Sequence, residues 1–398
     1  MIKTIKNFIV TILAISCFIL MIGGCSNLKS EEDNPIIDRE TSGDNTNTTS
    51  TDTETTDKVE NDDKSSADDE LDTDIVNHHR KTLTITAIGD CTLGSFPEVT
   101  KGKSFEDVLA ANNNDYEYPF KNAFKWIKSD DITLINFEGT LTDATKLANK
   151  KWRFKGPKEY TNFLTSSSIE VVNIANNHSY DYLEEGYIDT VTNMNDAGIG
   201  VTGNEYIHIK NIDSIKVAFI GHMVKDEPED IFDKVKKDIL KANQDGADVI
   251  VCSFHWGIEY NNTPTEYQKK LGHFAIDCGA DMVIGHHPHI LQGIELYNDK
   301  YIAYSLGNFV FGGNEILYDE KHKDVDTILL RQQIDLDDKE IIDIKLSIVP
   351  FRLSGDAKYN NYQPVVQQGD EGLRIRDKLI SLSDKLEYGI KSLEIEEE

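Results

Sequence analysis

Short apolar runs that each end in a cluster of polar residues determine which architectures this chain can adopt. Five such runs are typical of buried strands, namely 83–88, 132–135, 169–174, 249–253 and 282–284. Helical patterns lie around them, at 118–128, 182–197, 230–243 and 264–278. Strands that alternate with helices predict an α/β fold whose sheet is largely parallel in its first part.

The chain after residue 290 has a different pattern, in which short strands follow one another through tight turns. We expect strands at 293–297, 301–305, 309–311, 328–334 and 341–348, and a last helix at 369–386. In this interpretation the late strands form a second sheet packed on the first. The result is one two-sheet domain rather than two separate domains.

The polar clusters follow directly on the predicted strands. Because ligands bind outside the carboxyl ends of the strands in open α/β sheets, we expect these clusters to converge in space. The side chains concerned are Asp90, Asn136, Glu138, Asn177, His178, His255, His287 and His289. Carboxylate, amide and imidazole groups together suit divalent Mn, Fe or Zn ions. The sequence therefore predicts a metal site at this edge of the sheet.

Six ordered motifs carry a resemblance to a known family. They are Gly89-Asp90, Asn136-Phe137-Glu138-Gly139, Ala175-Asn176-Asn177-His178 with Asp181, His255-Trp256-Gly257, His287-Pro288-His289 and Ser305-Leu306-Gly307-Asn308-Phe309. Their order resembles the calcineurin-like metallophosphoesterase superfamily, and the finer pattern resembles its capsule-biosynthesis branch, the CapA or poly-γ-glutamate family. The resemblance covers about residues 82–350. It implies a two-sheet αββα sandwich of the metallophosphoesterase type.

The resemblance also implies roles for the clustered residues. Two divalent metal ions would be held by Asp90, Glu138, Asn177, His255, His287 and His289, with Glu138 as the bridging carboxylate. His255 and His287 would bind one metal together with Asn177, and His289 would bind the other. His178 would stay off the metals and act as general acid for the leaving oxygen. The superfamily often has a histidine two residues after its first aspartate, where this chain has Thr92, so one metal site lacks an imidazole.

Several residues near the motifs carry assignments with open alternatives. Asp181 either orients His178, as a catalytic partner, or caps the helix that starts near residue 182. Asn136 and Asn308 are assigned to substrate binding, although residues 305–308 also fit a tight turn. Arg153 lies in a basic, aromatic stretch, 152–156, that suits an anionic polymer or phosphate. Trp256 is expected to wall the site, and His286 to be a structural loop residue.

The N-terminus has the pattern of an export signal. Lys3 and Lys6 precede an apolar run over 8–22, which is short for a bilayer span. The following Gly23-Gly24-Cys25 resembles a bacterial lipobox, which implies cleavage after residue 24 and lipidation of Cys25. The alternative is an uncleaved signal anchor. Either reading places the chain outside the cytoplasm, membrane-anchored at a Gram-positive-like surface.

Residues 25–81 are predicted to form a disordered acidic tether. Residues 31–75 contain 17 Asp and Glu against 3 Lys and Arg, about half of the chain's net charge of −29. The folded part would then comprise residues 82–350 and a C-terminal extension, 351–398, docked on it. Its acidity excludes nucleic acid as a main partner, because phosphate backbones require Lys and Arg. Cys91, Cys252 and Cys278 are expected to be buried free thiols, with a Cys252–Cys278 bridge as the alternative.

Two classes of function remain open from the sequence. In the first, the protein is a metal-dependent hydrolase of a phosphoester or a related bond at the cell surface. In the second, it is a non-catalytic part of a capsule or poly-γ-glutamate machine, and binds an anionic surface polymer or the synthase complex. The ligand set favours the first class, and the absence of an imidazole at Thr92 favours the second.

Overall fold

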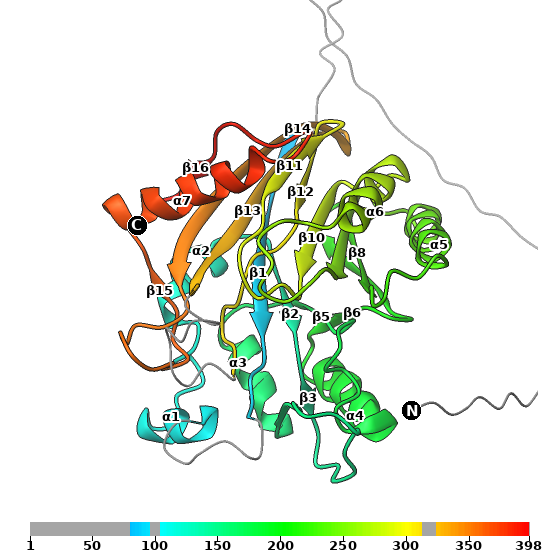
Figure 1. Ribbon diagram of the computed structural model, residues 1–398. Helices are drawn as coiled ribbons and strands as arrows, with labels where there is room; N and C mark the ends of the chain where they lie inside the picture. The colour runs from blue at the N-terminus through cyan, green and yellow to red at the C-terminus, as the bar shows by residue number, and fades with distance from the viewer. Residues whose placement is uncertain (1–79, 96–103, 313–323, 398) are drawn as a thin grey trace, which may run out of the picture. The chain divides into compact units, whose positions relative to one another are not determined.

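Two β-sheets form the centre of the protein in a computed structural model, which describes residues 80–95, 104–312 and 324–397 (Figure 1). The signal peptide, Cys25 and nearly all of the tether predicted at the N-terminus lie outside these residues. The first sheet has the order β15-β14-β13-β1-β2-β5-β6, and β16 pairs with β14. Its strands are β1 (Arg80–Cys91), β2 (Ile132–Phe137), β5 (Val171–Asn173), β6 (Gly200–Thr202), β13 (Asp326–Asp337), β14 (Glu340–Arg352), β15 (Val365–Val366) and β16 (Glu394–Ile395).

The second sheet has the order β11-β12-β10-β9-β8-β7. Its strands are β7 (Ile207–Ile212), β8 (Ile215–Met223), β9 (Val249–His255), β10 (Met282–His286), β11 (Ile294–Tyr297) and β12 (Lys300–Ala303). The four central strands run parallel, and β7 and β11 close the two edges as antiparallel partners. A small parallel pair, β3 (Thr140–Leu141) with β4 (Lys155–Gly156), stands apart from both sheets.

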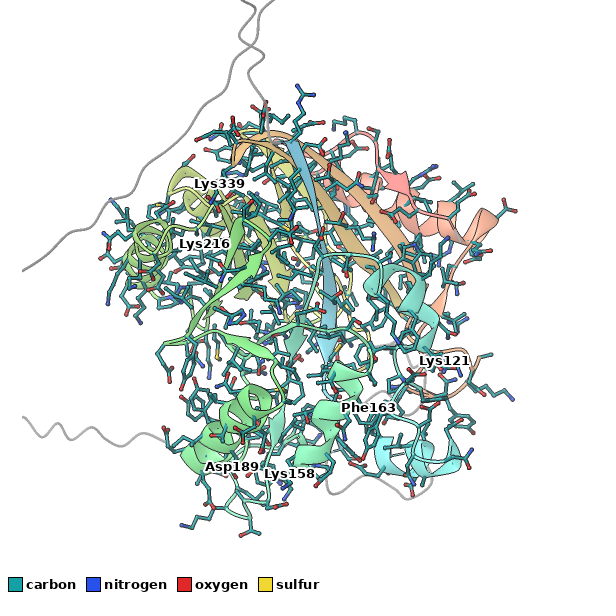
Figure 2. The ribbon with its side chains drawn as sticks, turned by 180° about the vertical axis from the view of Figure 1, so that it is seen from behind. Lys121, Lys158, Phe163, Asp189, Lys216 and Lys339 are labelled. Atoms are coloured by element: carbon teal, nitrogen blue, oxygen red, sulfur yellow. The ribbon has the colours of Figure 1, made fainter. Side chains whose placement is uncertain are left out.

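Helices cover the outer face of each sheet (Figures 1 and 2). The first sheet packs against α1 (Phe105–Ala111), α2 (Phe124–Ile127), α3 (Thr161–Thr165) and α4 (Leu183–Asp196), with short 3-10 turns at Lys121–Ala123 and Lys158–Tyr160. The second sheet packs against α5 (Ile231–Gln244) and α6 (Glu266–Asp277). Helix α5 buries Val235, Ile239 and Ala242, spaced three and four residues apart, against β8 and β9. The layers are therefore α/β/β/α, as the resemblance implied.

The space between the sheets is filled by alternate residues of the strands. Leu83, Ile85 and Ala87 of β1 point toward the second sheet, where Phe219 and Ile284 meet them, and all five are fully buried. This period of two follows from the pleat of a strand. It places the polar residues at the ends of β1, β9 and β10 along one edge of the sandwich.

The late strands divide between the two sheets, contrary to the sequence prediction that they form the second one: β11 and β12 join the second sheet, and β13 and β14 do not. Strands β13 and β14 return to the first sheet, where β13 pairs antiparallel with β1 over nine residue pairs. The second sheet is instead built from residues 207–303, because the apolar run 215–223 is a central strand that the sequence analysis overlooked. The strand predicted at 309–311 is an irregular segment, and the helix predicted at 118–128 is reduced to two short turns.

The C-terminal segment packs on the sandwich through helix α7 (Gly369–Ser383), which contacts β14 and β11. Ile375 and Leu379 of this helix join the core between the sheets. Arg374 and Lys378 bind the buried carboxylate of Asp326 at the start of β13. Among the described residues, no helix is both long and apolar enough to cross a membrane.

Candidate metal centre

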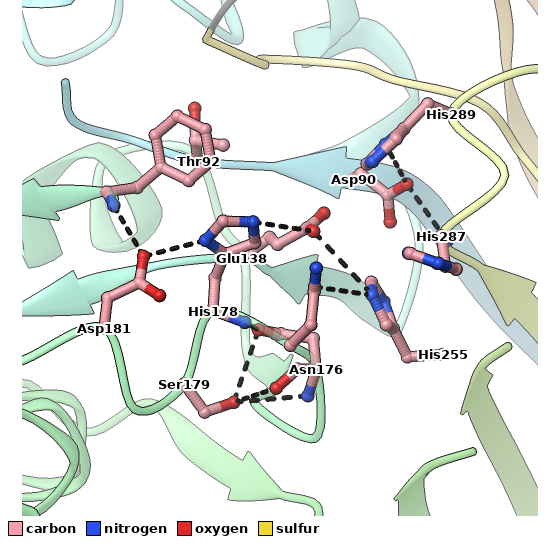
Figure 3. Close-up of polar contacts among 12 residues, drawn as sticks. Asp90, Thr92, Glu138, Asn176, His178, Ser179, Asp181, His255, His287 and His289 are labelled. Atoms are coloured by element: carbon pink, nitrogen blue, oxygen red, sulfur yellow. Dashed lines mark hydrogen bonds and ion pairs between the residues drawn. The ribbon is translucent and has the colours of Figure 1, made fainter. Parts of the chain in front are cut away.

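The polar clusters that follow the strands meet at one edge of the sandwich (Figure 3). Asp90 lies at a register shift between β1 and β2, and a bulge of this kind re-aims a side chain. Gly89 permits the bulge, because a Cβ at this position would lie 2.0 Å from the carbonyl oxygen of Gly307. Glu138 follows β2 directly, and His255 ends β9.

The loops that follow β5 and β10 bring the remaining donors to this edge. Asn176 accepts a hydrogen bond from His178 N at 3.0 Å and donates to Phe137 O at 2.7 Å, so the loop after β5 is tied to the end of β2. In the loop after β10, His287 and His289 have φ angles of +93° and +60°. Such left-handed conformations are strained for residues other than glycine, and they cluster at functional sites.

Two overlapping sets of donor atoms share Glu138. In one set, atoms of Asp90, Glu138 and His289 lie within 4.8 Å of one another, and in the other set the same holds for Glu138, His255 and His287. Asn177 joins the second set, because its Oδ1 lies 2.9 Å from His255 Nε2. The structure thus brings together all six residues that the resemblance assigned to metal binding, and Glu138 is common to both sets.

The surroundings of Glu138 fit a cation. Both carboxylate oxygens are buried and accept no hydrogen bond within the described residues. Oε1 lies 3.7 Å from His255 Nε2 and 3.8 Å from His178 Nε2. Donors that share one metal at about 2.1 Å lie roughly 3–4 Å apart. Burial raises the pKa of Glu138 well above its ordinary value, because a buried carboxylate without partners is unfavourable when ionised. A divalent ion between the two sets would remove this penalty.

The imidazoles of the centre differ in charge. Burial lowers the pKa of His255 well below its ordinary value, and burial with the neighbouring His289 lowers that of His287 to about 4. Both rings are therefore neutral at pH 7 and ready to bind a metal. Burial also disfavours the charged form of His289, but the carboxylates of Glu138 and Asp90 outweigh it and raise its pKa to about 9.

His178 faces the centre from the side. Its Nε2 points toward Glu138, while its Nδ1 lies 2.8 Å from Asp181 Oδ2 (Figure 3). Asp181 also accepts from Phe154 N at 2.6 Å and pairs with Lys150 Nζ at 2.5 Å. The alternative that Asp181 caps a helix is wrong, because α4 begins at Leu183 without a side-chain cap. Asp181 instead orients the ring of His178.

Comparison with known proteins shows which family has this arrangement. The profile of the family described as bacterial capsule synthesis protein PGA_cap matches residues 84–313, more than half of the chain. The chain belongs to this family. The match takes in Asp90 and every other candidate ligand of the centre.

The relatives of this chain include two curated bacterial proteins. The capsule biosynthesis protein CapA of Bacillus anthracis is 29% identical over 263 residues, which are 60% of this chain and 62% of the relative. The PGA biosynthesis protein CapA of Bacillus subtilis is 30% identical over 251 residues, 58% of this chain and 63% of the relative. The chain thus matches less than two thirds of either relative's length.

Solved structures with partial similarity to this chain include one described as a phosphatase and one described as a putative 5′-nucleotidase. A novel phosphatase of Mycoplasma pneumoniae aligns with a TM-score of 0.40 and 14% identity, over 71% of this chain and 96% of that one. A putative 5′-nucleotidase of Staphylococcus aureus aligns with a TM-score of 0.42 and 13% identity, over 76% of this chain and 59% of that one.

The residues assigned to substrate binding make structural contacts around the centre. Asn136 is fully buried and donates to Asp90 Oδ1 at 2.8 Å, and Asn308 Oδ1 lies 2.9 Å from His289 Nδ1. Each amide therefore holds a metal-binding residue from behind. Arg153 donates to the backbone carbonyls of Lys150 and Ala148, so its guanidinium ties its own loop together. These contacts give the three side chains structural roles, and their assignment to substrate binding stays a prediction.

Two residues that the sequence analysis passed over belong to the centre. His286 is the last residue of β10 rather than a loop residue, and its Nδ1 lies 3.4 Å from Asp90 Oδ1. The alternation along β10 contains this signal, because Met282, Ile284 and His286 share a face. Lys150 lies beside His178, with Nζ 3.2 Å from its Nδ1, and no motif marks it.

The other sequence predictions around the centre have mixed outcomes. The hydroxyl of Thr92 accepts a hydrogen bond from Gly312 N at 2.7 Å and is buried, so the imidazole common in the superfamily has no replacement at this position. Trp256 does not wall the site, because it is fully buried on the outer face of the second sheet and donates to Tyr304 O. Cys91, Cys252 and Cys278 are free thiols, so no Cys252–Cys278 bridge forms.

Proposed function

We propose that this protein is a cell-surface component of capsule or poly-γ-glutamate production whose centre is a metal-dependent phosphoester hydrolase. The observation that carries the proposal is the position of Glu138, buried without a hydrogen bond between two sets of metal-binding side chains. The placement of His178 supports it further, since a structural metal site has no use for an oriented imidazole beside its ligands. Relatives described as capsule and PGA biosynthesis proteins support the biological setting.

Each of the two donor sets would bind one metal ion in this proposal. Asp90, Glu138 and His289 would hold one divalent ion, and Glu138, Asn177, His255 and His287 the other. Divalent Mn, Fe or Zn, when bound, supplies Lewis acidity that polarises a phosphoryl oxygen and activates water. Asn136 and His286 keep the carboxylate of Asp90 aimed at the centre, and Asn308 does the same for His289.

Proton transfer falls to His178 in this proposal. Its Nε2 points toward the centre and is placed to protonate the leaving oxygen of a bound ester. Asp181 contacts Nδ1, which fixes the ring, and Lys150 pairs with Asp181. Burial lowers the pKa of His178 below its ordinary value, and the contact with Asp181 opposes this shift. The chain therefore has a proton donor, a group that orients it, and a counter-charge for that group.

The test measures bound metal and phosphodiester hydrolysis in the same preparations. We expect His287→Ala to lose metal and activity together. His178→Ala should keep its metal and lose roughly 10²- to 10⁴-fold in rate, the usual contribution of a general acid. His273→Ala is the control, because this half-buried histidine lies outside the centre and binds Glu295. Carefully prepared wild-type protein without metal would overturn the proposal.

A second candidate function is a non-catalytic polymer-binding or scaffold component of a synthase complex. The observation in its favour is Thr92, which leaves the first donor set without the extra imidazole. Metal binding without turnover, together with binding of the anionic polymer, would support this alternative. A strain that lacks the protein and still makes normal surface polymer would contradict both functions.

We further propose that the domain is anchored outside the cell through a lipid on Cys25. A signal peptide over 1–24 and an acidic tether over 25–81 would then precede the domain at 82–350 and its extension at 351–398. The support is the basic, apolar and Gly-Gly-Cys succession at the N-terminus. Cys25→Ala should release the protein from the membrane fraction, and an unchanged distribution would refute the anchor.

A further inference from the structure

A positively charged loop stands beside the metal centre of this acidic protein. We define the basic loop as residues 144–155, which make up most of the connection from β3 to β4 and the first residue of β4. It contains Lys146, Lys150, Lys151, Arg153 and Lys155, and the nearest carboxylate in the sequence is the exposed Asp143 just before it, although the chain has a net charge of −29. The net charge of the loop is therefore opposite in sign to that of the whole chain.

The loop is attached to the residues around His178. Lys150 Nζ donates to Asn177 O at 2.7 Å, and Ala148 N donates to Asp181 O at 2.9 Å. At the end of the loop, the ring of Phe154 lies 4.6 Å from the ring of His178. The loop is therefore held beside His178, the proposed proton donor, and not on a distant surface.

The charges of the basic loop fall into two groups. The first group binds other parts of the protein: Lys150 pairs with Asp181, and Arg153 and Lys155 donate to backbone carbonyls. Lys146 and Lys151 are exposed, and neither pairs with a carboxylate among the described residues. Lys151 Nζ lies over the ring of Trp152 at 4.5 Å, a contact that leaves its charge available to solvent.

Apolar side chains accompany the two exposed lysines. Leu147 is 48% exposed and Trp152 is 43% exposed, within the same loop. A polymer that carries carboxylates on a methylene-containing backbone complements both features. A polyphosphate chain complements only the charge, because it has no apolar part.

We propose that the basic loop is the binding surface for an extended polycarboxylate chain. Lys146 and Lys151 contact its carboxylates, Leu147 and Trp152 contact its methylene groups, and the chain is led past His178 toward the metal centre. This inference deepens the proposed function and rests on it only for the chemistry performed at the centre. Attraction between exposed charges is screened by salt, so the binding weakens as ionic strength rises.

The test titrates the full-length protein with fluorescently labelled poly-γ-glutamate at low salt. The loop variant Lys146→Glu/Lys151→Glu is compared with Lys121→Glu/Lys385→Glu, which makes the same charge change at two exposed lysines outside the loop (Lys121 is marked in Figure 2). We expect the loop variant to bind roughly tenfold more weakly or worse, because two charge contacts are lost and then reversed. The control pair should stay within about twofold of wild type, and bound metal should be the same in all three.

Each outcome supports or overturns the inference. Equal losses in the loop and control variants would show that net charge alone is responsible, and would overturn it. Polyphosphate of the same charge that binds as tightly as poly-γ-glutamate would overturn the choice of a polycarboxylate. Wild-type protein that hydrolyses a phosphodiester but binds no polymer would overturn this inference and leave the proposed hydrolase standing. If carefully prepared wild-type protein holds no metal and still binds the polymer through Lys146 and Lys151, the inference stands and the hydrolase is overturned.

Discussion

Replacement of Asp181 by alanine tests the network that orients His178. Asp181 is fully buried, and its carboxylate meets three nitrogen atoms, those of Phe154 N, His178 Nδ1 and Lys150 Nζ. In Asp181→Ala the Phe154 N–H loses its acceptor in a buried position. Lys150 loses its counter-charge while about 30% of its side chain is exposed.

The expected loss follows from these contacts. A hydrogen bond to a charged group contributes about 1.5–3 kcal/mol, and a buried donor left without a partner costs about 1–3 kcal/mol. Breaking a buried ion pair costs about 3–5 kcal/mol, and the partial exposure of Lys150 places its share well below that range. We therefore expect Asp181→Ala to lower the free energy of unfolding by roughly 3–5 kcal/mol. Asp181→Asn keeps an acceptor for Phe154 N and should lose roughly half as much.

The measurement is urea unfolding at pH 7.5 with a chelator present, so that metal binding does not contribute. The transition midpoint should fall while its slope stays constant, because the surface exposed on unfolding is unchanged. Asp143→Ala is the matched control, since it removes an exposed carboxylate from the same part of the chain. A loss below about 1 kcal/mol in Asp181→Ala, or one equal to that of the control, would refute the assignment of Asp181 as the support of His178.

Three further predictions follow from the site and the core. Gly89→Ala should destabilise the protein by roughly 3 kcal/mol in urea unfolding, because its Cβ would lie 2.0 Å from Gly307 O, and an effect below about 1 kcal/mol would contradict this. Burial raises the pKa of Glu170 from its ordinary 4.5 to about 7, so the folded state holds this proton more tightly and stability falls as pH rises from about 4.5 to 7. Glu170→Gln should flatten this part of the pH–stability curve, and an unchanged curve would count against it. Glu138→Gln should be at least as stable as wild type without metal, because it removes a buried carboxyl group that has no hydrogen bond, yet it should show no rise in melting temperature with Mn²⁺ where wild type does.

The sequence predicts where the helices and strands of this fold lie better than it predicts which strands pair with one another. The ends of α5 and α6 lie within two residues of the predicted helices, because their apolar spacing is regular. Pairing of β13 with β1 was not predicted, since periodicity identifies a strand but not its partner. The run 309–311 is apolar because Phe309 and Val310 are buried beside Asp90 and Thr92, with hydrogen bonds that do not extend into a strand.

The site shows the same division between local and long-range information. Asp90, Glu138 and His255 are found together because each lies at or just beyond the end of a strand, a position that the sequence reveals. The contacts of Asn136 and Asn308 with metal-binding residues were not predicted, because polar residues in a motif give no sign of their depth. Lys150 was missed because the path of its loop depends on the fold, which brings residue 150 beside residue 178.

The pairing of β1 with β13 has a consequence for the order of synthesis. Thr82 is hydrogen-bonded to Asp335, 253 residues later, so a chain made from its N-terminus produces β1 long before its antiparallel neighbour exists. Until then, one edge of β1 is unpaired, and open edges of this kind promote aggregation. The segment that matches the family profile ends at residue 313, before β13 begins. The matched segment therefore lacks the antiparallel neighbour of its own first strand, which the nascent chain supplies only with its last 70 or so residues.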